Sequence, residues 1–138
     1  MVIELSERNV ERVTHLFEQD YYVDQDMVQR AVRDQAMFNM IHNALVVKAD
    51  CVVRKETEYR QAEFARRRAV SIAGQQVFIV SPEDLILSKL DWAKESRSQI
   101  QLNDVRNLLR SVQDLDTDYL THWADRLGLA SLYQEVSA

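Results

Sequence analysis

The chain has 138 residues, 46% of them hydrophobic, which is enough for one globular domain with a buried core. Its 17 basic and 22 acidic residues give a net charge of −5, which argues against a dedicated nucleic-acid-binding protein. Cys51 is the only cysteine, so an internal disulfide and a thiolate zinc site within one chain are excluded. No run of eighteen apolar residues and no signal-peptide pattern occurs, so we expect a cytoplasmic protein without a membrane segment.

The first third of the chain predicts one short strand and two helices. Val2 to Leu5 predicts the strand, and a helix capped by Ser6 is expected to run to about Gln19. A second helix is expected after Asp24, a good N-cap residue. The apolar residues expected on the buried sides of these helices are Val10, Val13, Leu16 and Phe17 in the first, and Met27, Val28, Ala31 and Val32 in the second.

Residues 36–42 and 45–54 predict two strands joined at Asn43 and Ala44, where Asn43 would take the positive φ of a tight turn. In the second strand, period-two alternation separates an apolar face from a face that carries Lys48 and Asp50. On spacing alone, Asp50 is an exposed acid paired with Lys48 or with an arginine.

A charged helix is expected from Glu56 to Arg68, and it ends in three consecutive arginines, Arg66, Arg67 and Arg68. These arginines are either a solvated helix end that complements the helix dipole or a local basic patch that contacts phosphates. Residues 69–72 and 77–80 then predict a second hairpin, with Gly74 supplying the positive φ of its turn.

The strongest helix-start signal in the chain lies at residues 81–84. Ser81 can accept a hydrogen bond from the N–H of Asp84, Pro82 stands where its missing donor does no harm, and Glu83 and Asp84 complement the helix dipole. Lys89 falls within the apolar stripe of this helix. Its stem either packs along the stripe while the ammonium reaches water, or its ammonium is held over a cleft to meet a phosphate or carboxylate.

Three more helices complete the predicted fold. The first spans residues 102–112, the second starts at Asp116 or Thr117 and ends at Gly128, and the last follows it. Asp104, near the start of the first, is either an ordinary first-turn acid or a partner of Lys89. The predicted class is α+β, with a small mixed sheet and a C-terminal helical bundle. We expect a single domain over residues 1–138, with a sheet-containing portion at 1–80 and a helical portion at 81–138.

The segment S-P-E-D-L-I-L-S-K-L-D-W, followed by N-D-V-R-N-L-L, resembles the C-terminal half of small prokaryotic nucleotidyltransferase-like proteins, a group that includes toxin-type members of toxin/antitoxin pairs. Upstream, F-N-M-I-H-N-A-L-V-V-K-A-D-C-V-V resembles their hairpin, whose second strand carries the last of three active-site carboxylates. The resemblance implies that Asp50 is the third carboxylate and metal position. It implies substrate-side positions for Lys89 and for Asp104, which would open the next helix, and a substrate-proximal region at Arg66 to Arg68.

The same resemblance implies Mg²⁺ as cofactor if the protein is active, yet the family's Gly-Gly or Gly-Ser turn and Asp-x-Asp pair are not found in this sequence. We therefore expect a truncated or degenerate nucleotidyltransferase-like protein without independent transfer activity. The alternatives are an interaction module of a toxin/antitoxin-like pair, or a transferase completed by preceding residues or another chain. An uncovered sheet edge predicts a homodimer. A nucleotide or a partner protein is the other expected ligand, and nucleic-acid binding stays open.

Overall fold

The computed structural model describes residues 1–138, apart from the side chain of Glu95. The fold is α+β, with helices, a small mixed sheet and a separate hairpin, which confirms the predicted class. The chain divides into two compact units, Met1–Gln61 and Ala62–Ala138.

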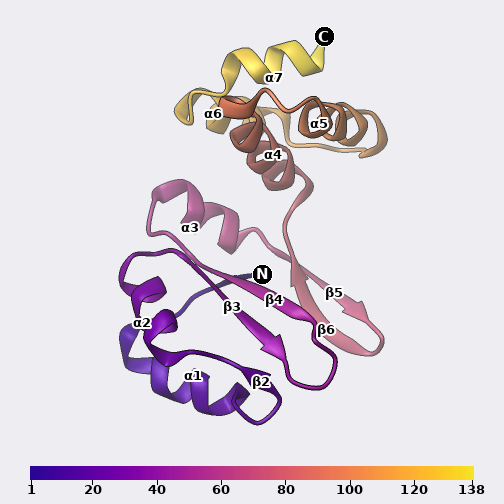
Figure 1. The fold of residues 1–138 in the computed structure, drawn as a ribbon. Coiled ribbons are helices and arrows are strands. Elements are labelled where there is room, and N and C mark those ends of the chain that lie inside the picture. Colours follow the sequence, from indigo (N-terminus) through magenta and orange to yellow (C-terminus); the bar gives the residue numbers. More distant parts are fainter. The chain divides into compact units, whose positions relative to one another are not determined.

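The first unit is a mixed sheet with helices on one face (Figure 1). Its elements are β1 (Val2–Ile3), a 3₁₀ turn (Glu7–Asn9), α1 (Val10–Phe17), β2 (Tyr21–Tyr22), α2 (Gln25–Arg33), β3 (Met37–His42) and β4 (Lys48–Val53). The strand order is β1-β4-β3-β2, with β1 parallel to β4 and the other neighbours antiparallel. Asp24 caps α2 by accepting a hydrogen bond from the N–H of Met27 at 2.9 Å, as its position in the sequence predicts.

The core of the first unit lies between the two helices and the covered face of the sheet. Its buried members are Val10 from α1, Val28, Ala31 and Val32 from α2, Phe38 and Met40 from β3, and Cys51 and Val53 from β4. Cys51 and Val53 alternate with the exposed residues Asp50 and Val52, so the predicted two-faced pattern of β4 is confirmed.

Two predictions in the region of α1 are wrong. Ser6 makes no side-chain cap; its carbonyl accepts from the N–H of Asn9 at 2.9 Å, so the chain passes through a 3₁₀ turn before α1 begins. Leu16 is 71% exposed, whereas Thr14 is buried. Thr14 can enter the core because its hydroxyl donates to the carbonyls of Val10 and Glu11, at 3.0 and 2.9 Å.

The predicted turn at Asn43 and Ala44 is also displaced. The positive φ falls at Val46, at 54°, and β4 begins only at Lys48. The imidazole of His42 accepts hydrogen bonds from the N–H groups of Ala44 and Leu45, which favours a longer loop than a two-residue turn.

The second unit consists of the hairpin and the helical bundle, and α3 (Glu58–Ala65) spans the boundary between the units. Its further elements are β5 (Arg68–Ile72), β6 (Gln75–Ile79), α4 (Pro82–Ser96), α5 (Gln99–Ser111), α6 (Thr117–Arg126) and α7 (Ala130–Ser137). The hairpin turns at Ala73 and Gly74, whose φ values of 51° and 80° fit a type I′ turn and confirm the role expected of Gly74.

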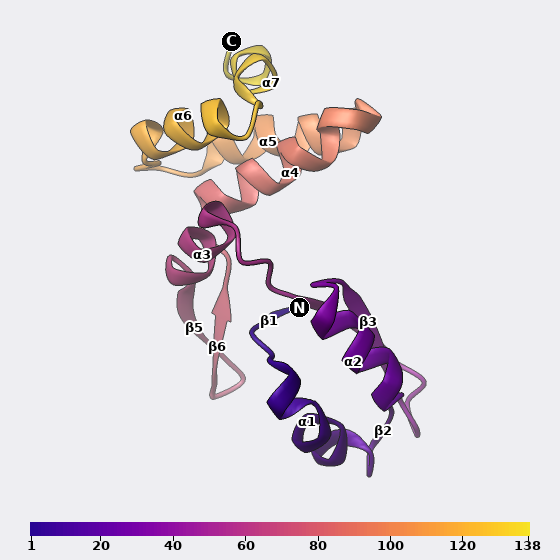
Figure 2. The ribbon, with the colours of Figure 1, turned by 90° about the vertical axis from the view of Figure 1, so that its left-hand side faces the viewer.

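The helical bundle is organised around α4, which packs beside α5 (Figure 2). Ser81 Oγ accepts from the N–H of Asp84 at 3.1 Å, so the predicted helix start at Pro82 is confirmed. Side chains with no exposed surface come from α4 (Ile86, Leu87, Leu90, Ala93), α5 (Leu102, Val105), α6 (Leu120, Ala124) and the residue before α7 (Leu129). Within the described part of the chain, no helix is long and apolar enough to cross a membrane.

Two predicted helix bounds in this unit need correction. The helix expected over residues 56–68 ends at Ala65, and Arg68 already belongs to β5. The helix expected from Leu102 begins at Gln99, one turn earlier, because Ser98 and the residues after it contain nothing that breaks a helix.

Candidate functional site

Asp50 lies on the open face of the first unit's sheet. Strand register places Asn39 of β3 beside Asp50. The carboxylate of Asp50 is 3.0 Å from the ammonium of Lys48. About half of each of these two charged side chains is exposed. This is the pairing that spacing alone predicts, and a surface ion pair of this kind contributes little to stability.

The residues around Asp50 do not fit the metal centre that the resemblance implies. The open face carries Val2, Val52 and Met37 in one row, Asp50 and Asn39 in the next, and Lys48, Ile41 and Tyr22 in the third. Asp50 is the one acid among these residues, whereas catalytic Mg²⁺ needs further acids or substrate phosphates. Among all described residues, no group of three or more His, Cys, Asp or Glu side chains is placed to hold a metal ion.

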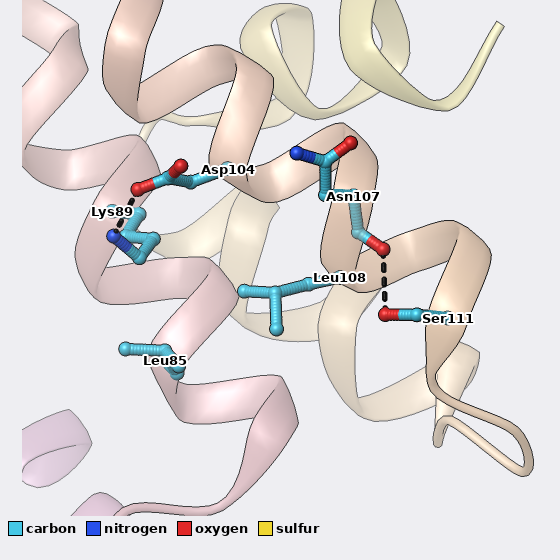
Figure 3. A pocket seen from close by; sticks show the side chains of 6 residues that line it. All are labelled: Leu85, Lys89, Asp104, Asn107, Leu108 and Ser111. Atoms are coloured by element: carbon cyan, nitrogen blue, oxygen red, sulfur yellow. Dashed lines mark hydrogen bonds and ion pairs between the residues drawn. The ribbon is translucent and has the colours of Figure 1, made fainter.

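Lys89 lies in the second unit, at a groove of about 240 Å³ between α4 and α5 (Figure 3). Its ammonium donates to Asp104 Oδ2 at 2.7 Å and to Gln101 Oε1 at 3.2 Å. The predicted contact between Lys89 and Asp104 is therefore present. The groove is lined by Leu85 and Lys89 from α4, and by Asp104, Asn107, Leu108 and Ser111 from α5.

The position of Asp104 differs from the one expected for a helix-opening acid. Because α5 begins at Gln99, Asp104 lies in its second turn and does not complement the helix dipole. Its carboxylate faces Lys89 instead (Figure 3). With side-chain exposures of 23% and 44%, the two groups form a half-buried tie between neighbouring helices.

Arg66, Arg67 and Arg68 do not form one basic patch. Arg66 and Arg68 approach the carboxylate of Glu83, at 3.4 and 3.7 Å, whereas the guanidinium of Arg67 lies over the rings of Phe64 and Phe78. The predicted helix that included all three arginines corresponds to α3, which ends at Ala65, before Arg66. Each arginine therefore has a partner within the second unit, and a phosphate-binding role stays a prediction.

Among the described side chains, the most buried charged groups are Glu83 and Asp84, which the sequence predicts only as helix-dipole acids. Asp84 has no exposed surface; it accepts hydrogen bonds from the Ser81 hydroxyl at 2.6 Å and the Tyr119 hydroxyl at 2.8 Å. Glu83 is 2% exposed and accepts from the backbone N–H of Asp116 at 3.3 Å. Glu83 lies one turn before Ile86 and two turns before Leu90, so it continues the apolar stripe of α4. This position was the sequence signal for its burial.

The charges of this cluster are balanced. The two carboxylates face two guanidinium groups, Arg66 and Arg68, so the formal charges cancel. Burial raises the pKa of Tyr119 far above its usual value, and the hydrogen bond to Asp84 and that carboxylate's charge add to the rise. The pKa of Glu83 is lowered: burial, the largest effect, acts to raise it, but several hydrogen bonds and the charge of Arg66 together outweigh burial.

Asp50 belongs to the first unit, whereas Lys89, Asp104 and the three arginines belong to the second.

Comparison of the chain with protein-family models, with curated proteins and with solved structures gave no significant match. The resemblance to nucleotidyltransferase-like proteins thus remains a proposal that rests on the residues quoted for it.

Proposed function

We propose that the chain is a degenerate nucleotidyltransferase-like protein that does not transfer nucleotidyl groups by itself. The observation that carries the proposal is the environment of Asp50. It is the single acid on the open face of its sheet, and Lys48 neutralises it at 3.0 Å. Transfer through two metal ions requires several carboxylates aimed at one point, which these described residues do not supply.

Lys89 supports the same proposal from the second unit. Lys89 already donates to Asp104 and Gln101, which occupies two of the three N–H donors of its ammonium. Asp104 also neutralises its charge, so the attraction of Lys89 for a substrate phosphate is weakened. The geometry favours a stabilising role for Lys89 as a link between α4 and α5.

The test is a transfer assay in which the purified chain is incubated with Mg²⁺, labelled nucleoside triphosphates, and protein and RNA acceptors. We expect the wild type and an Asp50→Asn variant to give the same background incorporation, because Asp50 holds no catalytic metal. Incorporation that is present in the wild type and lost in Asp50→Asn would refute the proposal. Asp50→Asn is a suitable test variant because the Asp50 side chain is about half exposed and the substitution keeps its size.

Calorimetric titration with Mg-ATP separates the proposal from the alternative of a pure interaction module. Mg-ATP binding by the wild type that weakens in Asp50→Ala or in Lys89→Ala, each tested separately, would support a retained nucleotide site in the unit that carries the substituted residue. Absence of Mg-ATP binding would favour the interaction module of a toxin/antitoxin-like pair.

Strand register favours a second candidate, a Mg²⁺-dependent transferase completed by residues that precede β1. Val2 lies opposite Val52 in a parallel pair. A segment that continued β1 upstream by two residues would therefore place a side chain beside Asp50 on the same face. The mass and N-terminal peptides of the protein from its own cells test this candidate: an Asp-x-Asp pair directly upstream would favour it, and a mass matching these 138 residues would refute it.

The homodimer and the cytoplasmic location also remain proposals. The sheet has two terminal strands, β1 and β2, and the edge from which the dimer was predicted is that of β1. Since β1 has only two residues, it offers few backbone groups to a partner strand, and such short edges are poor templates for pairing. Light scattering coupled to size exclusion tests the dimer, and cell fractionation tests the location.

A further inference from the structure

The largest exposed aromatic side chain of the second unit is that of Trp92, which follows Lys89 by three residues on α4. Trp92 is 72% exposed, although the apolar residues on the inner side of α4 are fully buried. Ile100, near the start of α5, is 73% exposed. Contiguous exposed apolar side chains of this size mark interaction surfaces.

Helical spacing aligns these residues with the groove. On α4, Leu85, Lys89 and Trp92 are separated by four and three residues, so they share one face. On α5, Ile100, Asp104 and Leu108 are separated by four residues each and form the facing stripe. We call these six residues the α4–α5 seam. Figure 3 shows Lys89 meeting Asp104, with Leu85 and Leu108 lining the same groove.

The seam consists of three levels, each with one residue from either helix. Lys89 and Asp104 form the charged middle level, at 2.7 Å. Leu85 and Leu108 lie on one side of it, toward the start of α4 and the end of α5. On the other side, Trp92 follows Lys89 by about 4.5 Å of helix rise and Ile100 precedes Asp104 by about 6 Å, so both lie toward the turn that joins the helices.

We propose that the α4–α5 seam binds the same seam of a second copy of this chain. A two-fold axis along the seam, parallel to the helices, places α4 of one copy over α5 of the other. Each level then meets its complement, because Trp92 lies over the partner's Ile100, Lys89 over the partner's Asp104, and Leu85 over the partner's Leu108.

Charge selects this arrangement among the face-to-face dimers. A two-fold axis across the helices would place Lys89 over Lys89 and Asp104 over Asp104, and like charges in contact are costly. An axis along the seam instead forms a square of alternating charges with apolar contacts at both ends. The four helices would then form an antiparallel bundle, a common way to bury such stripes. The proposal does not depend on any nucleotide chemistry.

The first test measures oligomeric state by sedimentation velocity of the full chain over a range of micromolar concentrations. We expect a monomer–dimer equilibrium whose Kd rises by at least about thirtyfold in Trp92→Ala, the effect of losing a tryptophan hot spot. Leu16→Ala is the matched control, because Leu16 is equally exposed but lies on α1, outside the seam. A wild type that is monomeric throughout, or a dimer that Trp92→Ala leaves unchanged, would overturn the proposal.

The second test uses charge reversal. The Lys89→Asp variant carries two acids at the middle level of the seam, and the Asp104→Lys variant carries two bases. Like charges would repel in a homodimer of either variant, so each should be monomeric alone. An equimolar mixture should form a heterodimer, because acids then face bases. Circular dichroism checks that each variant is folded. A dimer that persists in both single variants and disappears in Val2→Pro would assign the contact to the edge strand β1 and refute the seam.

Discussion

Replacing Tyr119 by phenylalanine tests whether the buried acid cluster holds the second unit together. The substitution removes the hydroxyl that donates to Asp84 Oδ1 at 2.8 Å and keeps the ring. The guanidinium of Arg66, 3.9 Å from the centre of that ring, retains its stacking surface. The change is therefore confined to one hydrogen bond on a carboxylate with no exposed surface.

The expected loss follows from the charge and burial of Asp84. A hydrogen bond to a charged group contributes about 1.5–3 kcal/mol, and water cannot replace the lost donor at a fully buried oxygen without opening the structure. Ser81 still donates to the other carboxylate oxygen, which keeps the cost toward the middle of that range. We expect the free energy of unfolding to fall by about 2 kcal/mol, or roughly 10 °C in Tm for a unit of this size.

The assay is urea unfolding followed by tryptophan fluorescence. Trp92 and Trp123 both lie in the second unit, so fluorescence reports its unfolding separately from that of the first unit. Tyr133→Phe, on α7, is the control, and we expect it to change stability by less than about 0.5 kcal/mol. A Tyr119→Phe variant as stable as this control would refute the view that Asp84 depends on the tyrosine hydroxyl.

Three further predictions concern charge, turn and cap. For Glu83→Gln, the loss in free energy of unfolding relative to wild type should be largest near neutral pH and should shrink as the pH falls below about 4.5. The folded-state pKa of Glu83 is lowered, so this carboxyl group adds stability only while it is ionised. Urea unfolding followed by fluorescence at several pH values measures this difference. Gly74→Ala should cost about 1 kcal/mol in the same assay, since φ is +80° and a Cβ would meet no neighbour, whereas Gln76→Ala should cost less. Asp24→Ala should weaken α2 by about 1 kcal/mol, seen as faster amide hydrogen exchange in that helix, and unchanged exchange would contradict the cap.

Short-range chemistry explains why several elements could be predicted from the sequence. The start of α4, the cap of α2 and the turn at Gly74 each depend on residues within three positions of one another. Side-chain hydrogen bonds and φ preferences act over that range in any context. The two faces of β4 follow equally from alternation along a single strand.

The partners of Glu83 and Asp84 could not be predicted because they are distant in the chain, although the apolar stripe offered a signal for the burial of Glu83. Glu83 meets Arg66 from 17 residues upstream, and Asp84 meets Tyr119 from 35 residues downstream. Without these partners, two acids beside Pro82 are well explained as dipole-complementing surface residues. The partners of Arg66 and Arg68 are equally non-local, since both arginines pair with Glu83 from beyond the end of α3.

Asp50 and Lys89 differ from that cluster in a way that bears on function. The resemblance assigns both residues to a site, and each is paired with an opposite charge that a substrate or metal would compete with. The pair of Lys48 and Asp50 is exposed and would separate at little cost, whereas Lys89 and Asp104 are half-buried between two helices. Of the two residues, Asp50 is therefore the one that the segment proposed to precede β1 could recruit, whereas the ammonium of Lys89 is already bound between α4 and α5.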